Sequence, residues 1–230
     1  VRNTLVGSGA GDSITTGNQN AIMGEGAGAA LTDADYNVVV GRAALATDTK
    51  GSRSTAIGTY ALGTQNLTTA TDTYNTAVGY SAGNQITTGL ANTIVGGLAG
   101  DALTVGADNV AMGYGALTSD DVGSRSIAIG SGALEAQNFS TATNTYNTAV
   151  GHHAGNDITT GDSNTLIGGL AGDALTTAES NVAVGYASLS ADTKGNNNVA
   201  IGREALAAQN FTSATAVSYT HLRAHETLIY

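Results

Sequence analysis

The 230-residue sequence contains no cysteine, no proline and no tryptophan. The lack of cysteine excludes disulfides, thiolate nucleophiles and cysteine-based zinc sites. Charged residues make up only 11%, and 8 Lys and Arg against 18 Asp and Glu give a net charge of −10. Nucleic acids and anionic membranes attract basic surfaces, so we expect neither as a partner. No apolar run reaches the roughly 18 residues of a membrane-spanning helix, so we expect no membrane insertion in this segment.

Glycine, in contrast, is abundant, with 32 residues, and the chain is repetitive. The unit is Asn or Ser, a variable residue, two apolar residues and Gly, and it occurs twelve times. Successive units start 17 residues apart, except that every fourth unit has 21, so four units form a cassette of 72 residues. We predict a repeat domain at 3–215, with cassettes at 3–74, 75–146 and 147–215. Because no initiator Met is present, we expect the start to be internal to a longer protein.

We number each unit from its Asn or Ser. An invariant Gly at position 5 indicates a bend that needs positive φ or close backbone approach. We therefore take these glycines as the structural residues of the repeat: Gly7, Gly24, Gly41, Gly58, Gly79, Gly96, Gly113, Gly130, Gly151, Gly168, Gly185 and Gly202. Asn tolerates the left-handed region and bonds its neighbours, so the Asn column predicts a ladder of turns.

Positions 9 and 12 vary together. Where position 9 is Gly, position 12 is Ile or Leu, and where position 9 is Leu, position 12 is Asp or Gln. Each unit thus supplies one bulky apolar side chain, as a close-packed small core requires. The short apolar run between Asn and Gly predicts a strand, and 17 Gly-rich residues cannot form a helix pair. We predict an all-β parallel β-solenoid of about 12 coils, with two short strands per coil, about 58 Å long at the usual strand spacing.

Positions 3 and 4 are both apolar in every unit, although adjacent strand residues point to opposite faces. We place position 4 inside the coil and expect position 3 to pack against partner chains. Val78→Asp or Ile129→Asp would then open the rod by burying an unpaired charge. The alternative is a monomer in which position 3 meets the opposite strand of its own coil.

Three stretches carry a family resemblance: NTAVGYSAG from Asn75, SIAIGSGAL from Ser126 and NVAIGREAL from Asn198. They resemble the YadA-like head repeats of trimeric autotransporter adhesins, a repeat type that also occurs in bacteriophage tail fibres. The resemblance implies a left-handed parallel β-roll, a homotrimer, and an extracellular fibre on a bacterial surface or a virion that binds a surface protein or glycan. The coils here are longer than those of the bacterial head, which leaves the phage fibre open as the alternative.

Four residues at position 6 are candidates to face a ligand, because Tyr and Arg are the residue types that anchor protein and glycan contacts and Tyr recurs at this position. They are Tyr80, Tyr114, His152 and Tyr186. The alternative is that these side chains have only a structural role and cover the edge of the coil. The extensions of the 21-residue coils, from Gln65 to Tyr74 and from Gln137 to Tyr146, are expected to project on one side of the rod as a binding edge.

No catalytic residue, cofactor or metal site is expected. His152 and His153 lie at positions that vary between units, and Asp101 and Asp173 recur through duplication. Asn66, Asn138 and Asn210 each open an Asn-x-Ser/Thr sequence, which repetition also explains. Two further functions are less favoured. A glycan-degrading β-helix needs paired carboxylates in a groove, and an ice-binding solenoid needs a Thr column on every coil, which the intervening units interrupt.

The last segment, 216–230, breaks the repeat. VSYTHLRAHET, from Val217 to Thr227, resembles the translation of a sequencing adapter. We therefore predict a non-native tail, and His221, His225 and Glu226 carry no weight in the functional argument.

Overall fold

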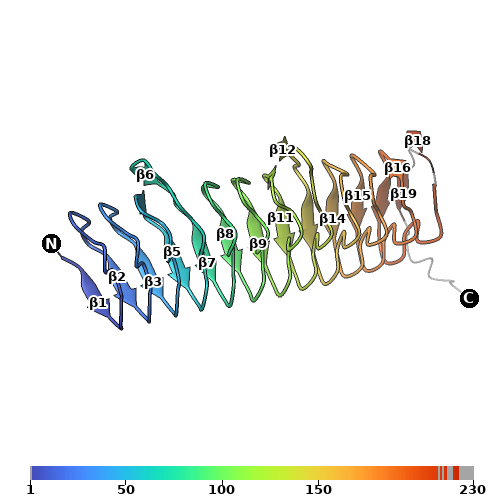
Figure 1. Ribbon diagram of the computed structural model, residues 1–230. Helices are drawn as coiled ribbons and strands as arrows, with labels where there is room; N and C mark the ends of the chain where they lie inside the picture. Colours follow the sequence, from blue (N-terminus) through green and yellow to red (C-terminus); the bar gives the residue numbers. More distant parts are fainter. Residues whose placement is uncertain (1, 212, 214, 217–219, 223–230) are drawn as a thin grey trace, which may run out of the picture.

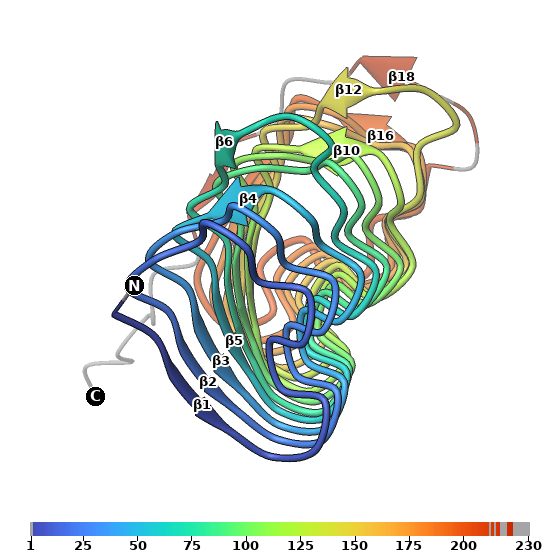
Figure 2. The same ribbon diagram turned by 60° about the vertical axis from the view of Figure 1, so that its left-hand side comes forward.

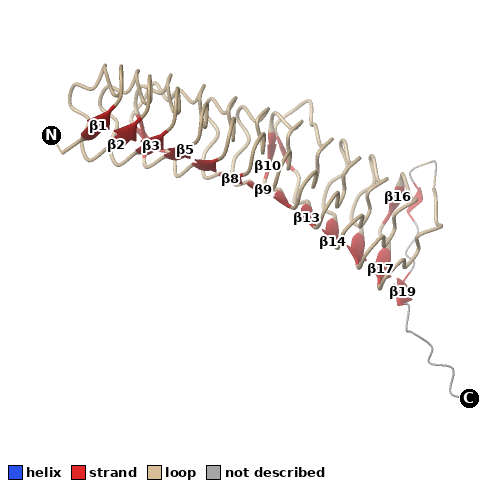
Figure 3. Ribbon diagram, turned by 90° about the horizontal axis from the view of Figure 1, so that it is seen from below, coloured by secondary structure: helices blue, strands red, loops and turns tan. Residues whose placement is uncertain are grey.

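The computed structural model describes residues 2–211, 213, 215–216 and 220–222. The described chain is an all-β parallel β-solenoid of about twelve coils without a helix, which confirms the predicted fold. Figure 1 shows the coils stacked side by side from the N-terminus to the C-terminus, and Figure 3 shows that the rod is gently curved. Each unit of the repeat forms one coil.

One parallel sheet runs the length of the rod, and each coil adds a strand of three residues to it. Positions 2, 3 and 4 of each coil pair with the same positions of the next, as Ala77 does with Ile94. The strands, in the order of the sheet, are β1 (Thr4–Val6), β2 (Ala21–Met23), β3 (Val38–Val40), β5 (Thr55–Ile57), β7 (Thr76–Val78), β8 (Thr93–Val95), β9 (Val110–Met112), β11 (Ile127–Ile129), β13 (Thr148–Val150), β14 (Thr165–Ile167), β15 (Val182–Val184), β17 (Val199–Ile201) and β19 (Thr220–Leu222).

The expectation of two strands in every coil is wrong. Among the described residues, a second, two-residue strand occurs only in the last two coils of each cassette, where an extension pairs with the coil before it. Elsewhere the coil consists of turns, whose left-handed residues interrupt any strand although their backbone amides still bond to a neighbouring coil. The short pairs are β4 (Gly51–Ser52) with β6 (Thr71–Asp72), β10 (Gly123–Ser124) with β12 (Thr143–Asn144), and β16 (Gly195–Asn196) with β18 (Thr215–Ala216).

The predicted register of the strand is also wrong. Position 3 points into the coil: Ala77 and Ile94 are fully buried. Position 4 points outward, so that Met112 and Ile167 are 38% and 40% exposed, and Val78 is half-buried. Alternation along a strand requires that positions 3 and 4 point to opposite faces, but it does not determine which of the two points into the coil. The core decides, because it is too narrow for Val, Ile or Met in every coil and is filled mostly by Ala at position 3.

The pairing of positions 9 and 12 has a steric cause. Position 9 has φ between +47° and +60° in all twelve coils. In the Gly coils a Cβ at this position would lie 2.9 Å from Leu31 Cδ1 at Gly28, and 3.0 Å from Leu103 Cδ1 at Gly100. In the Leu coils the leucine, such as Leu45, is itself fully buried. One bulky group therefore fits from either place but not from both, as the sequence indicated.

The Asn column forms an internal ladder. Asn92 accepts a hydrogen bond on Oδ1 from the backbone amide of Asn109, at 3.0 Å, and donates Nδ2 to the carbonyl of Gly106, at 2.9 Å. The second bond closes the coil across its core, and Asn92 is fully buried. The expected left-handed conformation, however, belongs to the preceding residue: Tyr74 and Ala91 have φ of 52° and 57°. Asn itself stays extended because its amide must point inward.

The glycines at position 5 all have φ between +120° and +145°. They also lie against one another, since a Cβ on Gly79 would sit 2.5 Å from the carbonyl oxygen of Gly96 in the next coil. Both positive φ and close approach thus require glycine here.

In the terminal segment, β19 (Thr220–Leu222) continues the main sheet and pairs with β17, Ala200 opposite His221. Residues 217–219 and 223–230, which hold most of the predicted adapter-like tail, lie outside the described residues.

Candidate binding surfaces

An apolar stripe runs along the outer face of the main sheet. We define it by positions 2 and 4 of every coil, from Thr4 and Val6 at one end to Val199 and Ile201 at the other. Position 4 is Val, Ile or Met in all twelve coils, and position 2 is Thr, Val, Ile or Ala. The stripe contains no charged residue, although the chain carries a net charge of −10. Continuous exposed apolar surface of this kind marks an interaction face.

A column of exposed aromatic and basic side chains borders the stripe where each strand ends. The candidate ligand-facing residues lie in it: Tyr80, Tyr114 and Tyr186 are 59%, 66% and 51% exposed, and His152 is exposed beside His153. Tyr60, at position 7, joins them by packing edge-on against Tyr80 at a centroid distance of 6.5 Å. These side chains are accessible, and their role in ligand binding stays a prediction.

Arginines support this first tyrosine column. The Arg42 guanidinium lies 5.1 Å from the centre of the Tyr60 ring and hydrogen-bonds its hydroxyl, and Arg203 lies 5.7 Å from the ring of Tyr186. The hydrogen bond to Tyr60 raises the pKa of Arg42 further above its ordinary value. Such cation–π contacts at exposed sites order side chains with only a small gain in stability.

A second tyrosine column, which the sequence analysis did not identify, borders the opposite side of the stripe. It occupies the left-handed residue before the Asn or Ser of the repeat and contains Tyr36, Tyr74 and Tyr146. Arg53 lies 4.8 Å from the Tyr36 ring centre and 6.0 Å from that of Tyr74, and Arg125 donates to the Tyr146 hydroxyl at 2.9 Å. The signal in the sequence was the recurrence of Tyr or Arg immediately before the Asn or Ser of the repeat.

The extensions project from the same side of the rod, as predicted: β6 and β12 both rise above the neighbouring coils in Figures 1 and 2. Leu67 and Phe139 anchor them and are only 7% and 6% exposed. An ion pair between Arg53 and Asp72, at 2.9 Å, ties the first extension to the coil before it. The extensions are therefore held in place rather than free.

A buried polar cluster underlies each extension and explains Asp and Gln at position 12. Gln65 donates Nε2 to Asp48 at 2.6 Å and to Ser54 at 2.9 Å, while its Oε1 accepts from Asn75. Asp48 also accepts the backbone amides of Gly51 and, in the extension, Leu67. The fourth coil has Ser54 where most coils have the Asn of the ladder. The Gln65 amide takes the place of that Asn by accepting the hydrogen bond from Asn75.

The same cluster recurs one cassette later. Gln137 donates to Asp120 at 2.5 Å and to Ser126 at 2.8 Å. Asp120 is fully buried, and burial raises the pKa of its carboxyl above the ordinary range, although hydrogen bonds from Gln137 and the Gly123 amide oppose the rise. The carboxylate has hydrogen bonds but no cation among the described residues, so it acts as an anchor of the backbone.

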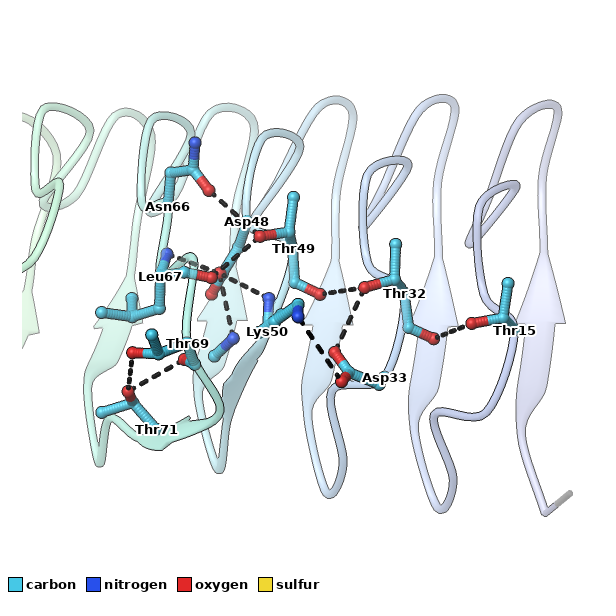
Figure 4. A network of polar contacts seen from close by, with 11 residues as sticks. Thr15, Thr32, Asp33, Asp48, Thr49, Lys50, Asn66, Leu67, Thr69 and Thr71 are labelled. Carbon is cyan, nitrogen blue, oxygen red and sulfur yellow. Dashed lines mark hydrogen bonds and ion pairs between the residues drawn. The ribbon is translucent and has the colours of Figure 1, made fainter.

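A threonine ladder runs along the outside of the coils at position 13. Thr15 donates Oγ1 to the carbonyl of Thr32, and Thr32 to that of Thr49, at 3.2 and 3.0 Å; Figure 4 shows these steps beside Asp48, one member of the polar cluster. The column is interrupted by Asn66, and later by Asp121 and Asn138. These hydroxyls therefore link neighbouring coils through the backbone.

One carboxylate pair lies near the His pair. Burial raises the pKa of Asp173, the Asp157 carboxylate adds to the rise, and His153 opposes it. Asp101, the equivalent of Asp173 one cassette earlier, instead accepts a hydrogen bond from Thr118. Within the described residues, no group of three or more His, Cys, Asp or Glu side chains is placed to hold a metal ion.

Comparisons with known proteins give no identification. No family model, no curated protein and no solved structure matches the chain. In the part of the chain that the structure describes, no helix has the length and apolar character to cross a membrane.

Proposed function

We propose that the chain is a non-catalytic segment of an extracellular trimeric adhesin, in which three rods associate along the apolar stripe and bind a surface protein or glycan. The observation that carries the proposal is the stripe itself. It is uncharged in all twelve coils and as long as the rod, so a second copy of the same rod matches it in length and chemistry.

Exposed valines, isoleucines and methionines on one sheet face support self-association. A strand that is apolar on both faces is normally buried on both faces. The coil covers position 3, and only another molecule can cover position 4. The trimeric state and the bacterial surface are taken from the resemblance to YadA-like head repeats, and the first tyrosine column supplies side chains typical of protein and glycan contacts.

The test of association uses the corrected register. Val78→Asp together with Val150→Asp places two carboxylates on the stripe without entering the core. We expect the wild-type chain to be a trimer by analytical ultracentrifugation and the double variant to be a monomer that keeps its β circular dichroism. Ala77→Asp, one residue away but fully buried, should unfold its coil in any oligomeric state. A wild-type chain that stays monomeric at high concentration contradicts the proposal.

Adhesion is tested separately. We expect the triple variant Tyr80→Ala, Tyr114→Ala and Tyr186→Ala to lose binding on arrays of glycans and matrix proteins, because these exposed rings are the anchors. Its trimer mass and melting temperature should not change. Tyr36→Ala with Tyr146→Ala, in the second tyrosine column, is the matched control. If both variants bind like the wild type, the tyrosines only cover the coil edge.

A further inference from the structure

The extensions of the fourth and eighth coils begin with the same acceptor sequence. Asn66–Leu67–Thr68 and Asn138–Phe139–Ser140 are Asn-x-Thr/Ser segments at equivalent places, four coils apart. Such segments accept Asn-linked sugars when the Asn is accessible on the surface. Asn210 opens a third copy, but its Thr212 lies outside the described residues, so the argument rests on the first two.

Both segments present the acceptor side chains outward. Leu67 and Phe139 are buried, whereas the residues on either side of each of them are exposed. Burial thus alternates along each three-residue segment, exposed–buried–exposed. The apolar middle residue therefore pins the segment to the coil, while the Asn amide and the Thr or Ser hydroxyl face solvent together.

The amide nitrogen of Asn66 is the free end of its side chain. Thr49 donates Oγ1 to Asn66 Oδ1 at 3.3 Å, and Figure 4 shows the nitrogen directed away from this contact. In the described part of the chain, Asn66 Nδ2 has no hydrogen-bond partner, and neither side-chain atom of Asn138 has one. The reactive nitrogen is thus both exposed and uncommitted.

The coil itself does not need Asn at this place. Position 13 is Thr in eight coils, and there the hydroxyl bonds to the next coil, as Thr87 does to the carbonyl of Thr104. Asn occurs only in the three coils that carry an extension. A Thr in place of Asn66 would preserve the solenoid, so folding alone does not account for the amide.

We propose that Asn66 and Asn138 are N-glycosylation acceptors, modified by transfer of a sugar from a nucleoside diphosphate donor. Asn Nδ2 forms a bond to C1 of the sugar and loses a proton to a base of the transferase. The C1–oxygen bond to the diphosphate breaks, and the nucleoside diphosphate leaves with the electron pair. The two sugars would stand on the projecting side of the rod, about 19 Å apart at four strand spacings. This inference does not depend on the proposed adhesin function.

The experiment incubates the folded full chain with a soluble N-glycosyltransferase and UDP-glucose, followed by intact-mass and peptide mass spectrometry. We expect hexose on Asn66 and Asn138. Asn144 and Asn197 are exposed but not followed by the acceptor pattern, so they should stay unmodified. Failure of both sites in the folded chain, while a peptide containing Asn66–Thr68 is modified, would overturn the proposal.

Variants separate recognition from folding. Thr68→Ala should abolish hexose at Asn66 and leave Asn138 modified as an internal positive control, whereas Thr68→Ser should retain both. Asn66→Thr should remove the first sugar and leave the melting temperature of the unmodified chain unchanged, because Thr fills this place in other coils. Modification at Asn66 that persists in Thr68→Ala, or that appears only after heat unfolding, also contradicts the proposal.

Discussion

At the scale of single residues, conformation rather than side-chain chemistry dictates the repeat. Four places take positive φ: the residue before the Asn or Ser from the second coil onward, the glycine at position 5, position 7 and position 9. All of these except position 5 have φ between +47° and +66° and tolerate residues such as Tyr, Arg or Leu. Position 5 lies at φ of +120° or more, in contact with the next backbone, and is restricted to Gly.

Gly79→Ala therefore should destabilise the rod markedly. The backbone strain alone costs of order 1–3 kcal/mol, and the new Cβ would sit 2.5 Å from the Gly96 carbonyl oxygen. Gly97→Ala is the matched control, because its φ is not positive and the nearest atom to its Cβ is Tyr114 Cδ2, at 3.7 Å. Chemical denaturation measures both. Equal stability of the two variants would show that the close approach at position 5 relaxes freely.

At the scale of the coil, the core is a fixed volume filled in one of two ways. A Gly coil places Ile or Leu at position 12, and a Leu coil moves the bulk to position 9 and places Asp or Gln at position 12. The exchange is possible because the vacated space at position 12 is filled by the polar cluster, in which each carboxylate and amide finds hydrogen bonds. Steric exclusion thus explains a covariation visible in the sequence.

We expect Gly100→Leu to destabilise its coil, because the new side chain must share space with Leu103, which lies 3.0 Å from the Cβ position. Overpacking of this kind costs about 1–3 kcal/mol. The double variant Gly100→Leu with Leu103→Ala should recover part of the loss, as measured by thermal melting. A double variant less stable than the sum of the two single changes would contradict the shared-volume explanation.

At the scale of the whole molecule, the cassette of four coils is the structural period. The Asp of the third coil needs the Gln of the fourth, which in turn contacts the Asn of the following coil, as Asp48, Gln65 and Asn75 do. Each coil otherwise contacts only its neighbours, so stability is a sum of coil and nearest-neighbour terms. Removal of a whole cassette keeps every such contact, whereas removal of a third or fourth coil alone breaks one.

Deletion of residues 75–146, a whole cassette, should give a shorter rod that still folds, because Tyr74 then precedes Asn147 just as Tyr146 does. Deletion of residues 126–146 alone, the eighth coil, leaves the buried carboxylate of Asp120 without Gln137. We expect the smaller deletion to be the more destabilising, since a buried carboxylate oxygen left without its partner costs about 1–3 kcal/mol or more. Circular dichroism melting decides between them, and the opposite order would show that the Asp–Gln contact is dispensable.

The sequence alone determined the period, the cassette, the parallel β-solenoid and the exchange of bulk between positions 9 and 12. Each follows from a covalent pattern that repeats in strict register, so one coil predicts the next. It also located the candidate tyrosines at position 6 and the projecting side of the extensions.

Only the tertiary structure decided which face of the strand is inside, since Ala77 and Val78 are both apolar and a period of two does not choose between them. The choice depends on the width of the closed coil, which the amide of Asn92 sets by bonding a carbonyl 14 residues away. The second tyrosine column and the polar cluster around Gln65 also join residues from successive coils. Side chains of successive coils become neighbours only when the coils stack, and their separation in the sequence does not show that they meet.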